Sequence, residues 1–98
     1  MSPGESPREC YDLAVAYLEM GVFEEAIEAF KESLEDESLF VAACSNVGLC
    51  YRKLHQPRFA AAWYRRGLEK TRAESREAQA MLYNLREALY EDGLASSE

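Results

Sequence analysis

The chain matches itself when its sequence is shifted by thirty-four residues, and this internal repeat most constrains the fold. Paired positions keep their size or their chemistry through both copies, without a gap. The clearest pairs are Cys10 and Cys44, Tyr17 and Tyr51, Ala26 and Ala60, Phe30 and Tyr64, and Leu34 and Leu68. A fixed period of roughly 20–50 residues is typical of repeat proteins, in which one supersecondary unit stacks on its copy. The sequence therefore predicts two stacked copies of one structural unit.

The spacing of apolar residues within each copy is helical. The positions i, i+3, i+4 and i+7 of one helical face are held by Cys10, Leu13, Ala14 and Tyr17. Gly21 interrupts this pattern, and Pro57 can open a helix because the first helical positions do not need their N–H groups. The pattern predicts helices over residues 7–20, 23–36, 39–54, 57–71 and 74–92. Linkers this short make neighbouring helices antiparallel, so we expect an all-α fold.

These motifs carry a resemblance to a known family. The spacing Cys10-x-x-Leu13-Ala14-x-x-Tyr17, followed by Ala26-x-x-x-Phe30, resembles the tetratricopeptide repeat (TPR) signature. The spacing Cys44-x-x-Val47-Gly48-x-x-Tyr51, followed by Ala60-x-x-x-Tyr64, matches it again. The chain departs from the signature in two ways, since cysteine replaces the first large aromatic residue, and Ser38 and Arg72 replace the closing proline. The resemblance implies a right-handed α-α superhelix, a TPR-like solenoid of five antiparallel helices.

The repeat register also divides the chain into segments. We expect a disordered lead over residues 1–6, TPR repeats over 7–40 and 41–74, a C-terminal capping helix over 75–93, and a disordered tail over 94–98. Gly93 is expected to cap the last helix. Leu82 occupies the position that the small residues Ala14 and Gly48 hold in the two repeats. We expect the larger side chain to fit there because no partner helix packs against this position. Together the segments form a minimal complete solenoid.

Charge and composition exclude several functions. The net charge is -7, and residues 1–40 hold eleven acidic and two basic residues. This acidity argues against binding to a phosphate backbone, for which the only basis is the cluster Arg58, Arg65, Arg66, Lys70 and Arg72. No apolar run approaches the roughly 18–20 residues that span a bilayer, and residues 1–7 lack the basic and apolar segments of a signal peptide. Three cysteines in helical apolar patterns indicate free thiols in a reducing compartment, so we expect a cytoplasmic protein.

No pattern of catalytic or metal-binding residues occurs in the sequence. Gly-rich phosphate loops and the motifs G-x-S-x-G and H-E-x-x-H are absent. His55 is a lone turn histidine, and Cys44 and Cys50 lie about 240° apart around one helix, so they do not converge on a metal. The glutamates Glu24, Glu25, Glu28 and Glu32 form the solvated face of an amphipathic helix. We therefore expect no enzyme activity, no cofactor and no metal site.

The resemblance implies that the first helix of each repeat lines a concave surface. The candidate partner-binding residues on this surface are Tyr11, Val15, Leu18, Asn46, Leu49, Arg52, Arg76, Gln79, Tyr83 and Arg86. Because arginine pairs with carboxylates and tyrosine is favoured at hot spots, the groove should take a peptide with apolar and acidic residues. The alternative is that the arginines pair with Glu19 and Glu87.

The same resemblance argues against one known type of TPR adaptor. Some TPR co-chaperones hold a C-terminal carboxylate in a clamp of lysine, asparagine and arginine. Of the equivalent positions here, Asn46 matches and Arg76 nearly matches, whereas Tyr11, Val15 and Ala80 do not. The sequence thus predicts a non-catalytic scaffold or adaptor that binds another protein or peptide, not nucleic acid or membrane. A self-associating structural unit, or part of a larger assembly protein, is the alternative.

Overall fold

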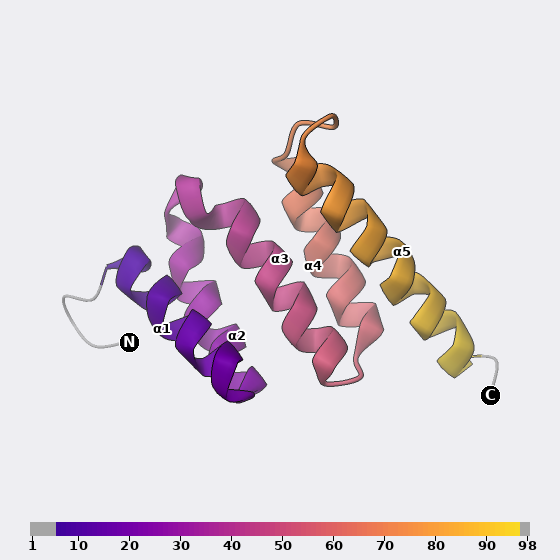
Figure 1. The fold of residues 1–98 in the computed structure, drawn as a ribbon, viewed down its shortest axis with the longest axis horizontal. Helices are drawn as coiled ribbons and strands as arrows, with labels where there is room; N and C mark the ends of the chain where they lie inside the picture. The colour runs from indigo at the N-terminus through magenta and orange to yellow at the C-terminus, as the bar shows by residue number, and fades with distance from the viewer. Residues whose placement is uncertain (1–5, 97–98) are drawn as a thin grey trace.

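A computed structural model describes residues 6–96 of the chain (Figure 1). The elements are α1 (Pro7–Met20), α2 (Phe23–Glu32), the 3-10 helix η1 (Ser33–Glu35), α3 (Glu37–Lys53), α4 (Pro57–Glu69) and α5 (Arg76–Ser96). None of these described residues forms a strand, so the expected all-α fold is confirmed.

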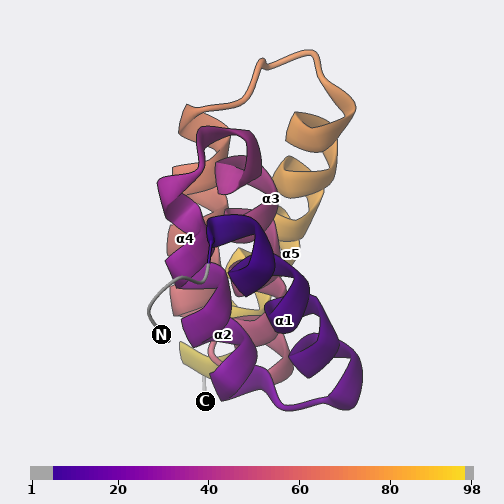
Figure 2. The ribbon, with the colours of Figure 1, turned by 90° about the vertical axis from the view of Figure 1, so that its left-hand side faces the viewer.

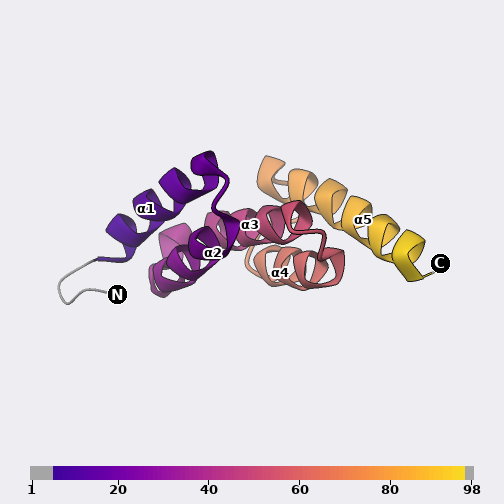
Figure 3. The same cartoon turned by 90° about the horizontal axis from the view of Figure 1, so that it is seen from below.

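The five α-helices form two layers. Figure 3 shows α1, α3 and α5 in one layer and α2 and α4 in the other. Seen from the end in Figure 2, the α1–α2 hairpin lies in front of the remaining helices, and Figure 1 places α5 at the opposite end. Each second-layer helix packs on two helices of the first layer, α2 on α1 and α3, and α4 on α3 and α5. The chain therefore stacks its hairpins along one direction.

The turns that close the two hairpins have the same geometry. Gly21 ends α1 with φ 78°, and its N–H donates to the Leu18 carbonyl oxygen at 3.0 Å. His55, thirty-four positions later, follows α3 with φ 60°, and its N–H donates to the Arg52 carbonyl oxygen at 3.0 Å. In both turns the next N–H reaches back to a tyrosine carbonyl oxygen. This pattern is a left-handed helix cap, so the repeat in the sequence is also a repeat in the backbone.

Small residues let the paired helices approach one another. Ala14 and Ala26 are fully buried where α1 meets α2, and Ala60 is fully buried on α4. Gly48 is buried against the ring of Tyr64, which is itself only 1% exposed. Large side chains fill the space beside these contacts, as a close-packed interior requires.

Several helix ends differ from the sequence prediction by one to four residues, and three of these differences concern local caps. The second helix ends at Glu32 rather than at 36, because the buried Ser33 hydroxyl donates to the Phe30 carbonyl oxygen at 2.6 Å and the chain tightens into η1. The last helix begins at Arg76 rather than at 74, because the Ser75 hydroxyl accepts from the Ala78 N–H at 3.0 Å and caps it.

The third difference concerns the end of α5. The helix continues through Gly93 to Ser96, so the expected cap at Gly93 is wrong and residues 94–96 are helical rather than a tail. Gly93 does not adopt the left-handed conformation that a glycine cap requires. At the other end, Ser6 is part of the fold as the N-cap of α1, with a capping box to Glu9. The rest of the expected lead and tail, residues 1–5 and 97–98, lies outside the described residues.

Candidate protein-interaction site

A cleft of about 540 Å³ lies between α3 and α5, the two neighbouring helices of the first layer. It is lined by Ser38, Val41, Ala42, Ser45, Asn46, Lys70, Thr71, Arg72, Ser75, Glu77, Ala80 and Met81. The α3 residues come from its N-terminal half and the α5 residues from its first two turns. The segment 70–75 between α4 and α5 closes one side of the cleft.

The cleft exists because α4 packs against both α3 and α5 from the second layer. Gly67 of α4 brings its backbone close to Met81, whose side chain is 1% exposed. Met81 in turn belongs to the core cluster against which Val41 packs. The floor of the cleft is therefore continuous with the hydrophobic core and cannot move independently of it.

Arg52 joins α3 to α5 on the C-terminal side of the cleft. Its Nη2 lies 2.8 Å from Oε2 of Glu91, its Nε donates to Glu91 Oε1 at 3.3 Å, and its Nη1 donates to Asn84 Oδ1 at 3.1 Å. The hydrogen bond to Glu91 raises the pKa of Arg52 further above its ordinary value. Such two-point pairing fixes orientation as well as distance, so Arg52 sets how far α5 stands from α3.

The Tyr64 hydroxyl lies under this junction. Burial raises its pKa, and the nearby Arg52 guanidinium partly opposes the rise. Within residues 6–96, however, the buried hydroxyl has no partner in hydrogen-bond geometry, so Arg52 acts on it mainly through charge. This leaves Tyr64 a core residue with a polar tip rather than part of the cleft.

Cations gather at the entrance of the cleft. Lys70 lies 5.3 Å from the ring centre of Phe40, and Arg72 lies 3.4 Å from the Glu74 carboxylate. The Arg72–Glu74 pair is exposed on both sides, so water screens it and it contributes little to stability. Both cations therefore remain available to an incoming acidic group.

The predicted residues of α1 and α3 lie beside the cleft. Asn46 lines it and donates through Nδ2 to the Tyr11 hydroxyl oxygen at 3.1 Å. Tyr11 also packs edge-on against Phe30 at 5.3 Å between ring centres. Val15 and Leu18 are partly buried against the core, and Leu49 is half-buried. Of these residues only Asn46 lines the cleft, and Tyr11 is linked to the cleft through its hydrogen bond with Asn46.

The predicted residues of α5 do not line the same cleft. Gln79, Tyr83 and Arg86 surround another hollow, and at roughly 100° per residue they lie on about the opposite side of α5. Arg76 is exposed at the start of α5. Arg52 has an internal partner, as one alternative held, but that partner is Glu91 rather than Glu19 or Glu87. The structure thus separates a set that the sequence placed together.

The α4–α5 connection contributes residues that the sequence pattern does not indicate. Lys70, Thr71, Arg72 and Ser75 lie outside the predicted set, and so do Val41, Ala42 and Ala80. The α4–α5 connection lacks the closing proline of the repeat signature. The repeat register therefore does not indicate that residues of this connection line a cleft. Asn46 and Ala80, which occupy two positions of the co-chaperone clamp, both line the cleft.

No helix among the described residues is long and apolar enough to cross a membrane. The same part of the chain contains no group of three or more metal-ligating side chains. The cysteines Cys10, Cys44 and Cys50 are buried and form no disulfide.

Comparison with known proteins gives one family. Residues 9–39, which form α1, α2, η1 and the start of α3, match the tetratricopeptide repeat family model. A search of curated proteins finds no match. Tetratricopeptide repeats generally mediate protein–protein interactions through the surfaces that stacked hairpins create. Residues 9–39 thus match a tetratricopeptide repeat, and the stacked helical hairpins and the repeated turn geometry are consistent with a TPR-like fold.

Proposed function

We propose that the chain is a non-catalytic scaffold or adaptor that holds a segment of another protein in the α3–α5 cleft. The observation that carries this proposal is the cleft itself, a hollow of about 540 Å³ between two stacked helices of a TPR fold. This volume falls within the range of roughly 300–1,000 Å³ that is usual for ligand sites. The proposal concerns the first-layer face, where the sequence also predicted binding.

The lining of the cleft suggests the chemistry of the bound segment. Val41 and Met81 offer an apolar floor for one anchoring side chain. Ser45 and Asn46 offer polar groups to the backbone of an extended peptide. Lys70 and Arg72 at the entrance favour a neighbouring carboxylate. We therefore expect a peptide that combines an apolar anchor with an acidic residue.

Three hydroxyls of the cleft support binding rather than catalysis. The Thr71 hydroxyl donates to the Gly67 carbonyl oxygen at 2.6 Å, and the Ser75 hydroxyl donates to the Arg72 carbonyl oxygen at 2.8 Å. The Ser38 hydroxyl donates to Asp36 at 2.7 Å in the cap of α3. Two of these hydroxyls donate to backbone carbonyl oxygens and the third donates to the carboxylate that caps α3, so each has a structural role.

The cations of α4 support a protein partner rather than nucleic acid. Arg58 lies 3.8 Å from Asp92, and Arg66 lies 4.4 Å from the ring centre of Trp63. The net charge of -7 further opposes the approach of a phosphate backbone, which a free basic stripe would attract. We further propose a cytoplasmic location, where the three buried thiols stay reduced.

Selection of peptides from a random display library on the immobilised chain tests this function. We expect the enriched peptides to share an apolar and an acidic residue. Their binding, measured by fluorescence anisotropy, should be lost when the cleft is filled and its entrance reversed by Ala80→Trp and Lys70→Glu.

The matched control is Ala62→Trp with Lys53→Glu. Both of these residues are exposed and neither lines the cleft, so this variant should bind like the parent chain. Enriched peptides that bind equally well to the cleft-filled variant would remove the cleft as the binding site.

A further inference from the structure

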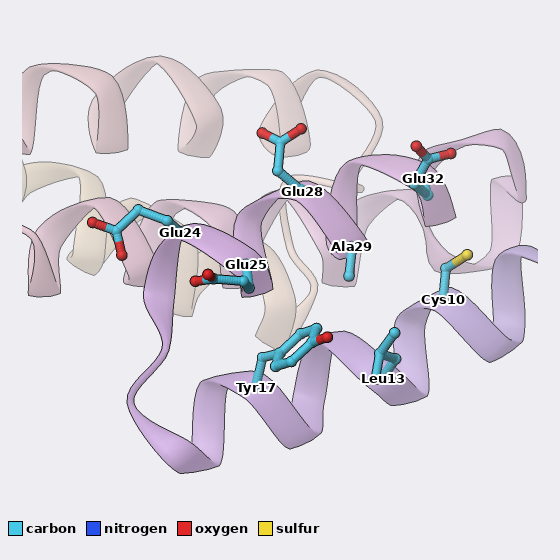
Figure 4. A pocket seen from close by; sticks show the side chains of 8 residues that line it. All are labelled: Cys10, Leu13, Tyr17, Glu24, Glu25, Glu28, Ala29 and Glu32. Atoms are coloured by element: carbon cyan, nitrogen blue, oxygen red, sulfur yellow. The ribbon is translucent and has the colours of Figure 1, made fainter. Parts of the chain in front are cut away.

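A second hollow, of about 390 Å³, lies between α1 and α2 at the end of the molecule opposite α5 (Figure 1). Leu13 and Tyr17 of α1 form its apolar side. The glutamates Glu24, Glu25, Glu28 and Glu32 line its other side. Figure 4 shows the row from Cys10 through Leu13 to Tyr17 on α1 and the four glutamates along α2, with the carboxylates of Glu28 and Glu32 pointing away from α1. The hollow is thus an apolar groove with an acidic edge.

The second repeat shows what normally covers such a groove. Leu13, Tyr17 and Ala29 correspond, thirty-four positions on, to Val47, Tyr51 and Trp63. These three counterparts pack into the core cluster of the first repeat, where α2 and η1 lie along α3. The first of these pairs shows the effect of the missing cover, because Val47 is 0% exposed whereas Leu13 is 43% exposed. The groove is therefore a repeat-stacking face that no helix covers within residues 6–96.

The opposite end of the molecule exposes the complementary feature, a single apolar helix face. Leu82 of α5 occupies the position of Ala14 and Gly48, which are buried under the second helix of their own repeats. No helix of the described chain covers α5 in this way, so Leu82 is 46% and Leu89 is 42% exposed. Arg86 lines the same hollow as Leu82 and Leu89, and it forms no ion pair with any described residue.

Charge decides which surfaces can meet. Two copies of the α1–α2 groove repel each other, because each presents four carboxylates. The exposed face of α5 instead offers two leucines for the apolar side and Arg86 for the acidic edge. We propose that copies of this chain associate head to tail, with the exposed face of α5 of one copy lying in the α1–α2 groove of the next.

This arrangement fits both partners physically. An amphipathic helix that lays its apolar face into a groove is a common recognition mode. Inside the chain, α2 and the short η1 pack in this way against the equivalent face of α3. The contact joins two different surfaces, so it leaves one groove and one α5 face open at the ends and can add further copies. The α3–α5 cleft lies on about the opposite side of α5 and stays accessible.

Complementation between two blocked variants tests the proposal. Leu13→Lys places a cation in the groove that repels Arg86, and Leu82→Glu places a carboxylate on α5 that repels the glutamates. Sedimentation equilibrium should show that the average mass of the parent chain rises with concentration, while each variant alone stays monomeric. An equimolar mixture of the two variants should associate, because each variant retains one intact surface and these two surfaces are complementary.

Controls separate this outcome from unfolding and from other modes of association. Far-ultraviolet circular dichroism should show parental helicity in both variants, and Ala62→Lys on the exposed face of α4 should associate like the parent chain. A parent chain that stays monomeric up to the order of 1 mM, the weak end of specific association, would show that the ends serve another partner and would overturn the proposal. A mixture that stays monomeric, or single variants that still associate, would overturn it as well.

Discussion

Two glycines stand where helices come into close contact. A Cβ atom on Gly48 would lie 2.6 Å from Cε1 of Tyr64, and one on Gly67 would lie 2.7 Å from Sδ of Met81. The Tyr64 ring is rigid and almost fully buried, whereas the Met81 thioether can rotate away. The strictest requirement for glycine is therefore at Gly48, where α3 meets α4.

Replacing Gly48 by alanine should lower the free energy of unfolding by about 1–3 kcal/mol, because the overpacking outweighs the gain in helix propensity. Gly93 is the matched control. It lies inside α5, where a Cβ atom would meet no other atom within 4 Å, so Gly93→Ala should stabilise the chain by up to about 1 kcal/mol. Chemical denaturation measures both values, and equal effects at the two glycines would contradict the packing described for α3 and α4.

His55 holds a backbone conformation that suits glycine better. Its φ of 60° is left-handed, which costs a non-glycine residue roughly 1–2 kcal/mol, and the equivalent Gly21 avoids that cost. We expect His55→Gly to raise the unfolding free energy by about 1 kcal/mol, and Gly21→Ala to lower it by a similar amount. A thermal melt in which His55→Gly is destabilising would show that the side chain has a role beyond the turn.

At the scale of the helices, two kinds of contact position α5: apolar packing on α4 and a polar junction with α3. The helix α4 holds both α3 and α5, but the distance between α3 and α5 depends on Arg52, Asn84 and Glu91. The Arg52 side chain is 20% exposed, so its pairing is screened less than that of a surface ion pair. This junction determines the width of the cleft.

A double-mutant cycle with Arg52→Met and Glu91→Gln measures that junction. We expect a coupling energy of about 1 kcal/mol, because the pair is two-pronged and partly buried. The exposed pair Arg72–Glu74 is the control and should give a coupling near zero. Equal coupling in both pairs would mean that Arg52 does not set the position of α5.

Over the whole molecule, the sequence predicted the helices better than the site. Periodic apolar residues located all five α-helices, because burial repeats every 3.6 residues. The ends were less accurate because they depend on local caps at Ser33 and Ser75. The handedness of the superhelix stays a prediction.

The cleft was harder to predict because it depends on contacts between distant residues. The partner of Arg52 lies thirty-nine positions away, which a repeat period cannot indicate. The position of Lys70 and Arg72 at the entrance depends on the course of the α4–α5 connection. The repeat register predicted Asn46, which lines the cleft, because this residue lies on a regular helix. The register also grouped Gln79, Tyr83 and Arg86 with Asn46, although these three residues lie on the side of α5 that faces away from the cleft.

Stability should fall as the pH rises from 9 to 11. Burial raises the pKa of Cys44 and of Cys50 from 9.0 to about 11 and also raises that of Tyr64. The unfolded thiols lose their protons first, so the stabilisation present below pH 9 is lost as the pH approaches 11. The denaturation midpoint should decrease over this interval, and less steeply in the variant Cys44→Ala with Cys50→Ala. An identical slope in the variant would contradict the burial of these thiols.

The central claim is that the α3–α5 cleft holds a peptide. Backbone amide chemical shifts measured by nuclear magnetic resonance, while a display-selected peptide is added, test it most directly. The account predicts the largest shifts at Val41, Ser45, Asn46 and Ala80, with little change at Ala62 on the outer face of α4. Shifts concentrated on α4, with the cleft residues unchanged, would contradict it.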